Sequence, residues 1–333
     1  MEVNPQFGED GQYAPVHIRS VEGETDCVNA IFQQPWWLDA VAPGSWDEAT
    51  VERDGRVVAR LPYVVRGRRP FRLLTMPPLT QTLGPALKRS DAKAAHALGD
   101  ELALLAELEA ALPPADGFVQ QFSPAVMNAL PFYWAGYTLE LQYTYRLEGL
   151  GSEADLWNGL RGNIRREIRK ARTRVEVRDD AGLDRFHAVW AKTFARQELE
   201  APAPLAQLAR LDAACAARGA RALLSAHDEH DRIHAVAYIV WDSHAAYYLL
   251  GGADPELRTS GASSLLMWQS IMRARAVTDV FDFEGSMLQP VERFFRAFGS
   301  RQTPYLRVSR CSAHARAALA AREGWRAVRR RVR

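Results

Sequence analysis

The sequence has few cysteines, no long apolar run and almost no net charge, and each absence argues against a class of protein. Its three cysteines, Cys27, Cys215 and Cys311, lie far apart, which favours a reducing compartment over a disulfide framework. No apolar run approaches the about 20 residues that a membrane-spanning helix needs. The first residues, MEVNPQFGED, lack the basic-then-apolar pattern of a signal peptide, and the formal net charge is only +2. We therefore expect a cytoplasmic protein with no membrane span.

The sequence also lacks the patterns of a metal site or of a covalent catalytic mechanism. His227, His230 and His234 are expected at a strand end, in a turn and on the next strand, so they should not converge on a metal. No Ser-His-Asp order and no Cys–His pairing stands out. We expect no metal and no permanently bound cofactor.

One stretch of the sequence occurs twice. Asp279–Gly299 (DVFDFEGSMLQPVERFFRAFG) aligns without gaps with Asp116–Gly136 (DGFVQQFSPAVMNALPFYWAG), and each reads as a strand followed by an aromatic helix. Upstream, Arg56–Val65 resembles Arg232–Val240, so the two pairs keep the same order. With 333 residues the chain can hold two domains, each with its own core. We predict two copies of one α/β domain.

Glycines and prolines suggest where these domains begin and end. Leu73–Gly84 contains Pro77 and Pro78 and is expected to be an irregular loop that lines a cleft. Gly149–Gly151 is the expected boundary between the copies. The predicted organisation is a first domain at 1–150, a second at 151–312, and a basic helical tail at 313–333.

A pair of carboxylates ends the strand of the second copy. Asp282 and Glu284 are two residues apart, so a strand would place both on one face and Phe281 and Phe283 on the other. Gly285 then breaks the strand. The carboxylates could act as acid–base groups at the carboxyl end of a strand, where open α/β sheets place their ligands. The structural alternatives are a loop cap at Asp282 and an ion pair of Glu284 with an arginine.

A basic helix is predicted at the start of the second copy. Asp155–Arg174 has an apolar stripe and a cationic stripe. Guanidinium groups suit phosphates and carboxylates, but a run of charges more often forms a solvated face. The candidates on this helix for holding a diphosphate, a carboxylate or a tRNA phosphate are Arg165, Arg166 and Lys170.

The order of these elements resembles the GNAT acyltransferase fold. The tandem copies, the segment RGNIRREIRKARTRVEV and the motifs FDFEGS and ERFFRAFGSRQTPY are similar to the Fem-type (FemABX-like) branch, with its BioF-type acetyltransferase domain. The resemblance spans residues 30–310 and is more specific in the second half. It implies an α/β (α+β) protein of two tandem GNAT-like domains, each a mixed central sheet flanked by helices.

The resemblance also implies a reaction and its co-substrates. Fem enzymes take their acyl group from aminoacyl-tRNA, other GNAT enzymes from acyl-CoA, and the acceptor is an amine on a small molecule or a peptide. The resemblance places the basic helix near the acceptor side of the cleft, so it implies that Arg165, Arg166 and Lys170 bind the acceptor. Six residues are candidates for the donor site: Leu250, Gly251 and Gly252 at a strand end, and Arg258, Gly261 and Ser263 in a loop that approximates the GNAT pyrophosphate loop. The alternative for this loop is a helix start capped by Ser263 or Ser264.

Two functions of different classes follow. In the first, the protein is an N-acyltransferase in which Glu284 deprotonates the amine, Asp282 supports it, and backbone N–H groups near Leu250–Gly252 stabilise the oxyanion. In the second, the protein is a non-catalytic GNAT pair that binds RNA, including tRNA, or a nucleotide-linked ligand through its basic helix.

Overall fold

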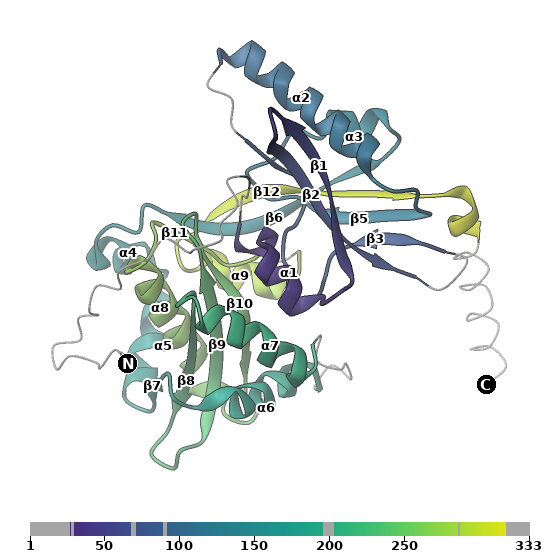
Figure 1. The fold of residues 1–333 in the computed structure, drawn as a ribbon. Coiled ribbons are helices and arrows are strands. Elements are labelled where there is room, and N and C mark those ends of the chain that lie inside the picture. The colour runs from purple at the N-terminus through teal and green to yellow at the C-terminus, as the bar shows by residue number, and fades with distance from the viewer. Residues whose placement is uncertain are drawn as a thin grey trace. The chain divides into compact units, whose positions relative to one another are not determined.

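A computed structural model of the chain describes residue 27 and residues 30–67, 71–88, 92–195, 203–285 and 287–317 (Figure 1). These residues form two compact units. The N-terminal unit contains Thr25–Gln142 together with Pro304–Arg333, and the C-terminal unit contains Tyr143–Thr303. No described helix is long and apolar enough to span a membrane. The predicted tail lies outside the described residues from position 318 onward.

The N-terminal unit is built on a mixed sheet with the strand order β1-β2-β3-β5-β12, in which β4 pairs with β2. Its core joins aliphatic residues of the sheet to Leu105 and Leu108 of α2 and to an aromatic group around Phe132. The elements are η1 (Ile31–Gln33), α1 (Pro35–Val41), β1 (Trp46–Arg53), β2 (Arg56–Arg66), β3 (Leu73–Thr75), β4 (Ala86–Leu87), α2 (Ala94–Ala111), β5 (Gly117–Gln121), α3 (Leu130–Trp134) and β12 (Arg301–Cys311).

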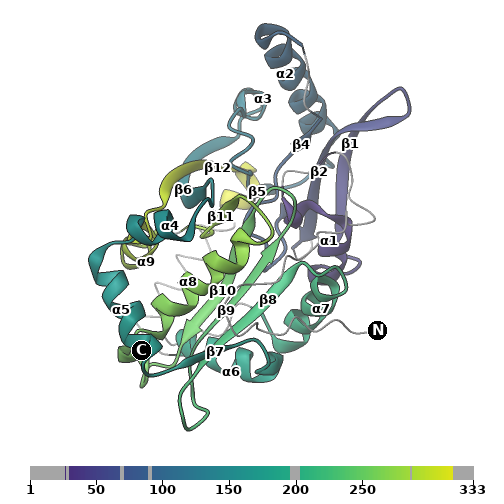
Figure 2. The same cartoon turned by 90° about the vertical axis from the view of Figure 1, so that its left-hand side faces the viewer.

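The C-terminal unit has a mixed sheet with the order β6-β11-β10-β9-β8-β7. Helices cover both faces, with α8 on one and α6 and α7 on the other (Figure 2). Every position of β9 is therefore buried, and its sequence is a nearly continuous apolar run. The elements are β6 (Thr138–Glu148), α4 (Glu153–Gly159), α5 (Gly162–Arg172), β7 (Glu176–Arg178), α6 (Gly182–Ala195), α7 (Leu205–Ala216), β8 (Arg221–His227), β9 (Ile233–Trp241), β10 (Ala246–Ala253), η2 (Arg258–Ser260), α8 (Ala262–Arg275), β11 (Val280–Asp282) and α9 (Gln289–Arg296).

The repeated stretches occupy equivalent positions in the two sheets, as predicted. The strand of each copy runs parallel to the strand that precedes it in its sheet, β5 beside β3 and β11 beside β10. An aromatic helix follows in each, and Gly136 (φ 84°) and Gly299 (φ 82°) then turn the chain into a long strand. The upstream segments Arg56–Val65 and Arg232–Val240 also occupy matching positions. They supply β2 and β9, and each of these strands lies between two antiparallel neighbours. The tandem repeat is therefore present in the fold.

The compact units do not follow the boundary expected at Gly149–Gly151. Arg146–Glu148 of β6 pairs with β11 inside the C-terminal unit, and Arg307–Cys311 of β12 pairs with β5 inside the N-terminal unit. Each copy thus contributes the second half of its last strand to the sheet of the other. Glycines mark where the chain turns, but they carry no information about which strand a segment pairs with.

Two local predictions need correction. Leu73–Thr75 is not part of a loop but forms β3, because Pro77 and Pro78 come only after the paired residues. The aromatic helix expected in the second part of Asp116–Gly136 is short and begins only at Leu130, with Pro131 in its first turn, where a proline is tolerated.

Candidate functional site

The pairing between β10 and β11 covers only the first two residues of β10 and the last two residues of β11. Ala246 pairs with Phe281 and Tyr247 with Asp282, and the parallel register ends there. Immediately beyond, the β9–β10 register shifts between Tyr248 and Leu250, which marks a β-bulge. The β10 backbone after Tyr247 therefore has no ladder partner on its β11 side within the described chain. Backbone groups at such a point are available to a bound molecule.

The chain after β11 turns away in an unusual conformation. Glu284 (φ 60°) and Gly285 (φ 59°) both occupy the left-handed region. A Cβ at position 285 would lie 2.4 Å from the Tyr143 carbonyl oxygen and 2.7 Å from the Thr144 Cα, so both conformation and space require glycine there. A glutamate in this region costs about 1–3 kcal/mol, and such residues cluster at functional sites.

Asp282 is buried and held by three groups. It accepts hydrogen bonds from the Thr144 hydroxyl and, over 2.8 Å, from the backbone N–H of Glu284, and the Arg146 Nε lies 3.4 Å from its Oδ2. Burial raises the pKa of Asp282, while the Arg146 charge and these hydrogen bonds oppose the rise. These contacts hold the Asp282 carboxylate in place, and its role beside Glu284 stays a prediction.

Glu284 is the more perturbed carboxyl group. Burial raises its pKa well above the ordinary value, and the nearby charge of Asp282 adds to the rise. Phe281 and Phe283, on the opposite face, lie in the apolar core, as the alternation predicted. A glutamate in this environment can take a proton from an ammonium group at a pH where an ordinary glutamate would not.

The glycines expected at the donor site are explained by packing. A Cβ at Gly252 would lie 2.7 Å from the Thr193 Oγ1 and 3.0 Å from the Trp190 Cα, so α6 packs closely against this residue. The Tyr248 ring covers Gly251, where a Cβ would overlap its hydroxyl group. Close packing therefore explains why both positions are glycine. A bound donor would contact the edge of β10 after the bulge, starting at Leu250.

The loop expected to hold phosphate precedes a deeply buried helix. The residue before α8 is Gly261 (φ 86°), and a Cβ there would lie 2.5 Å from the Glu167 carbonyl oxygen. Neither Ser263 nor Ser264 caps the helix, because Gly261 occupies the cap position and provides no side-chain hydrogen bond. Ser263 and Arg258 are exposed at this end. The Ser260 Oγ instead accepts a hydrogen bond from the Ala262 N–H over 3.3 Å, so this helix start is partly capped.

The basic residues of α5 are divided among several partners. Arg165 donates to the Asn158 carbonyl oxygen over 3.3 Å, and Lys170 pairs with Glu167. Arg169 and Arg172 both stack over the Trp157 ring at 5.6 Å. Arg166 is exposed and, within the described chain, has no ion-pair or hydrogen-bond partner. Of the three residues expected to bind an acceptor, Arg166 is the one whose charge is most accessible.

Sequence reasoning did not single out the partners of Asp282. Thr144 and Arg146 come from β6 and Tyr247 from β10, far from Asp282 along the chain. The pKa of Tyr247 is well above its ordinary value because of burial and the charges of Asp242 and Asp282. The spacing of Thr144 and Arg146 on one face of a strand was a weak signal, and nothing in it indicated the pairing with β11.

A Ser-His-Asp chain that the sequence did not indicate is also present. The Ser225 Oγ lies 2.9 Å from the His227 Nε2, and the His227 Nδ1 lies 2.7 Å from the Asp231 Oδ1. Ser225 is fully buried, so its hydroxyl group cannot reach a substrate. The hydrogen bonds that link these three side chains close the β8–β9 hairpin. Within the described residues, no group of three or more His, Cys, Asp or Glu side chains could hold a metal.

Comparisons with known proteins give a family for the second half and a fold for the whole chain. Residues 158–296 match the acetyltransferase (GNAT) domain. The structure is similar to that of FemX, with a TM-score of 0.62, 14% identity, and coverage of 83% of this chain and 91% of FemX. It is also similar to a tandem GNAT protein from the clavulanic acid biosynthesis pathway, with a TM-score of 0.51, 10% identity and coverage of 83% and 86%.

A third similar structure is the C-terminal domain of a putative lysylphosphatidylglycerol synthetase from Agrobacterium fabrum. Its TM-score is 0.52 at 14% identity, and the match covers 89% of this chain and 94% of that domain. No curated protein sequence matches the chain significantly. At these identities the solved structures establish the fold, a tandem GNAT arrangement, and leave the substrates open.

Proposed function

We propose that the protein is an N-acyltransferase that transfers an acyl or aminoacyl group to an amine, because residues 158–296 match the acetyltransferase (GNAT) domain. The observation that carries the proposal is the position of Glu284. A carboxyl group with a raised pKa stands directly after the point where β10 and β11 stop pairing. Perturbed carboxyl groups at strand ends are candidates for acid–base catalysis.

The reaction would proceed by direct attack. The acceptor arrives as an ammonium ion, and Glu284 takes one proton so that the nitrogen lone pair becomes available. The amine attacks the acyl carbonyl carbon, and the N–H groups of β10 at and after Leu250 stabilise the negative charge on oxygen. Collapse of the intermediate expels the sulfur of CoA or the ribose oxygen of tRNA, and this leaving group takes up the second proton that the nitrogen loses. Direct attack requires no covalent enzyme intermediate.

The donor would bind along β10 and at the start of α8. Its acyl group would lie at Leu250, Gly251 and Gly252, and its phosphates would lie at the start of α8 near Arg258, Gly261 and Ser263. Both acyl-CoA and aminoacyl-tRNA carry phosphates, so both are candidates. The acceptor, a small molecule or a peptide with an amine, would be held by Arg166, with Arg165 and Lys170 beside it.

Thermal stabilisation distinguishes the donors. A donor that binds the folded protein raises the melting temperature according to its concentration relative to Kd. We expect acetyl-CoA or an aminoacyl-tRNA to stabilise the protein, and deacylated tRNA to stabilise it less than the charged form if tRNA is the donor. Stabilisation by all RNAs alike, with no turnover of either donor, would instead support a non-catalytic RNA-binding protein.

A further inference from the structure

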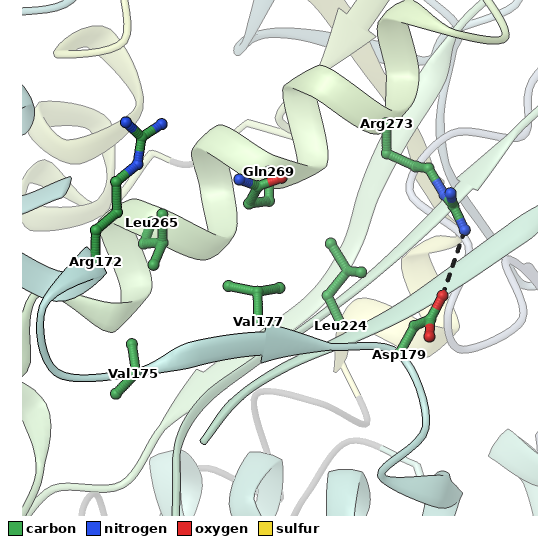
Figure 3. Close-up of a pocket in the computed structure, with 8 residues that line it drawn as sticks. All are labelled: Arg172, Val175, Val177, Asp179, Leu224, Leu265, Gln269 and Arg273. Carbon is green, nitrogen blue, oxygen red and sulfur yellow. Dashed lines mark ion pairs between the residues drawn. The ribbon is translucent and has the colours of Figure 1, made fainter. Parts of the chain in front are cut away.

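A cavity of about 210 Å³ lies in the C-terminal unit, apart from the residues assigned to acyl transfer (Figure 3). It is enclosed by the end of α5, by β7 and the residue that follows it, by β8 and by α8. The residues that line it are Arg172, Val175, Val177, Asp179, Leu224, Leu265, Gln269 and Arg273. None of them belongs to the candidate acyl-transfer site, so the cavity is a separate feature.

The floor of the cavity is aliphatic. Val177 and Leu224 face Leu265 across it, and Val175 closes one side (Figure 3). Val175, Leu224 and Leu265 are buried. Apolar surface of this kind binds an alkyl group with about 25 cal/mol for each Å² removed from water.

Helix α8 explains why the core does not fill this space. Leu265, Gln269 and Arg273 recur every four residues, so they form one stripe that faces the cavity. A helix that packs on a sheet normally presents an apolar stripe to it. Here the second and third members are a glutamine and an arginine, although most of α8 is buried. A few polar groups above an apolar lining are typical of a ligand pocket.

The rim of the cavity carries a net positive charge. Arg172 stands at one end, and at the other the Arg273 Nη2 lies 3.5 Å from the Asp179 Oδ2 (Figure 3). Two guanidinium groups and one carboxylate give a formal charge of +1. Arg172 stacks on Trp157 at 5.6 Å and, within the described residues, has no carboxylate partner. The charge that would balance the rim is a ligand's anionic group.

We propose that this cavity binds a small aliphatic monocarboxylate, with its carboxylate at Arg172 and its alkyl chain on the floor formed by Val177, Leu224 and Leu265. A guanidinium fork matches the two oxygens of a carboxylate. The volume lies below the about 300–1,000 Å³ of pockets for drug-sized ligands. It corresponds to about seven water molecules at about 30 Å³ each, which suits an acid of about four to six carbons.

Isothermal titration calorimetry with hexanoate tests the proposal on the wild-type chain. Hexylamine has the same alkyl chain and the opposite charge, so it should not bind. Arg172→Met should weaken hexanoate binding at least tenfold. The matched control is Arg169→Met, which removes an equivalent contact with Trp157 but does not line the cavity. It should leave the affinity within a factor of two.

A second variant tests the location independently of Arg172. Val177→Trp replaces a small residue of the cavity floor with a much larger apolar side chain, so the protein should keep its fold, as its melting temperature will show, while hexanoate binding falls at least tenfold. The proposal is overturned if wild-type protein does not bind hexanoate, if hexylamine binds equally well, or if folded Val177→Trp binds hexanoate with unchanged affinity.

Discussion

Glu284 combines a left-handed backbone, a raised pKa and a position at the end of β11. The spacing of Asp282 and Glu284 in the sequence predicted a shared face and a division of roles. It could not predict the left-handed turn, because that conformation depends on Gly285 fitting against Tyr143 and Thr144 of a strand from the other copy. The pair of carboxylates was thus visible in the sequence, whereas its surroundings were not.

The raised pKa of Glu284 makes a prediction about stability. A carboxyl group with a higher pKa in the folded state binds more protons there than in the unfolded state, so stability falls as pH rises from 4.5 through the folded-state pKa. Glu284→Gln removes this loss of folding stability at high pH. We expect the variant to melt at a higher temperature than wild type at pH 8, and the difference to shrink toward pH 4. Exposed Glu153→Gln is the control, and an equal shift in both variants would contradict the burial of Glu284.

Gly285 provides a second prediction at the residue scale. Gly285→Ala should destabilise the fold by at least about 2 kcal/mol, because the Cβ would adopt a left-handed φ and also overlap the backbone of β6. Gly149→Ala is the matched control, since Gly149 has a left-handed φ of 66° but nothing within 4 Å of an added Cβ. Chemical denaturation measures both. Equal losses in the two variants would show that the close approach at Gly285 is unimportant.

At the scale of elements, the start of α8 is the proposed site of the donor's phosphates. Ser263→Glu should abolish stabilisation by whichever donor binds wild type, because it places a negative charge where a phosphate would lie. Ser263→Gln adds similar bulk without charge and should keep most of the binding. The thermal shift with acetyl-CoA and with aminoacyl-tRNA measures both variants. Undiminished donor binding by Ser263→Glu would remove this helix end from the site.

Helix α5 is the proposed element for acceptor binding. Arg166→Ala should raise the acceptor KM several-fold and leave kcat nearly unchanged, as expected when binding is lost equally from ground and transition states. Arg210→Ala, at an exposed position of α7, is the control. Steady-state kinetics at saturating donor separates the two constants. A fall in kcat with an unchanged KM would assign Arg166 to the chemical step instead.

At the scale of the whole molecule, the repeat was visible in the sequence but the exchange of strands was not. Asp116–Gly136 and Asp279–Gly299 share their pattern because each forms the same strand, helix and glycine turn. The strands with which β6 and β12 pair are set by hydrogen bonds between segments far apart in the chain, and no local sequence pattern predicts these bonds. For the same reason Thr144 and Arg146 could not be assigned to the site from the sequence.

Because of this exchange of strands, residues of the first copy contribute to the candidate acyl-transfer site. Thr144 and Arg146 hold Asp282, and they lie on a strand that follows the first aromatic helix along the chain. The second copy therefore cannot assemble the complete carboxylate environment from its own residues alone. The proposed enzyme is one in which both copies are needed to build one reaction centre.

Turnover of the donor tests the central proposal most directly. Purified protein is incubated with acetyl-CoA or with aminoacyl-tRNA and a panel of amines, and the protein-dependent loss of the thioester or ester bond is followed. We expect amine-dependent loss of one donor, and Glu284→Gln should lower its kcat by about 10²–10³ with the fold intact, in line with general-base contributions. No protein-dependent loss of either donor, or full activity of Glu284→Gln with the same acidic limb of the pH–rate profile, would contradict the account.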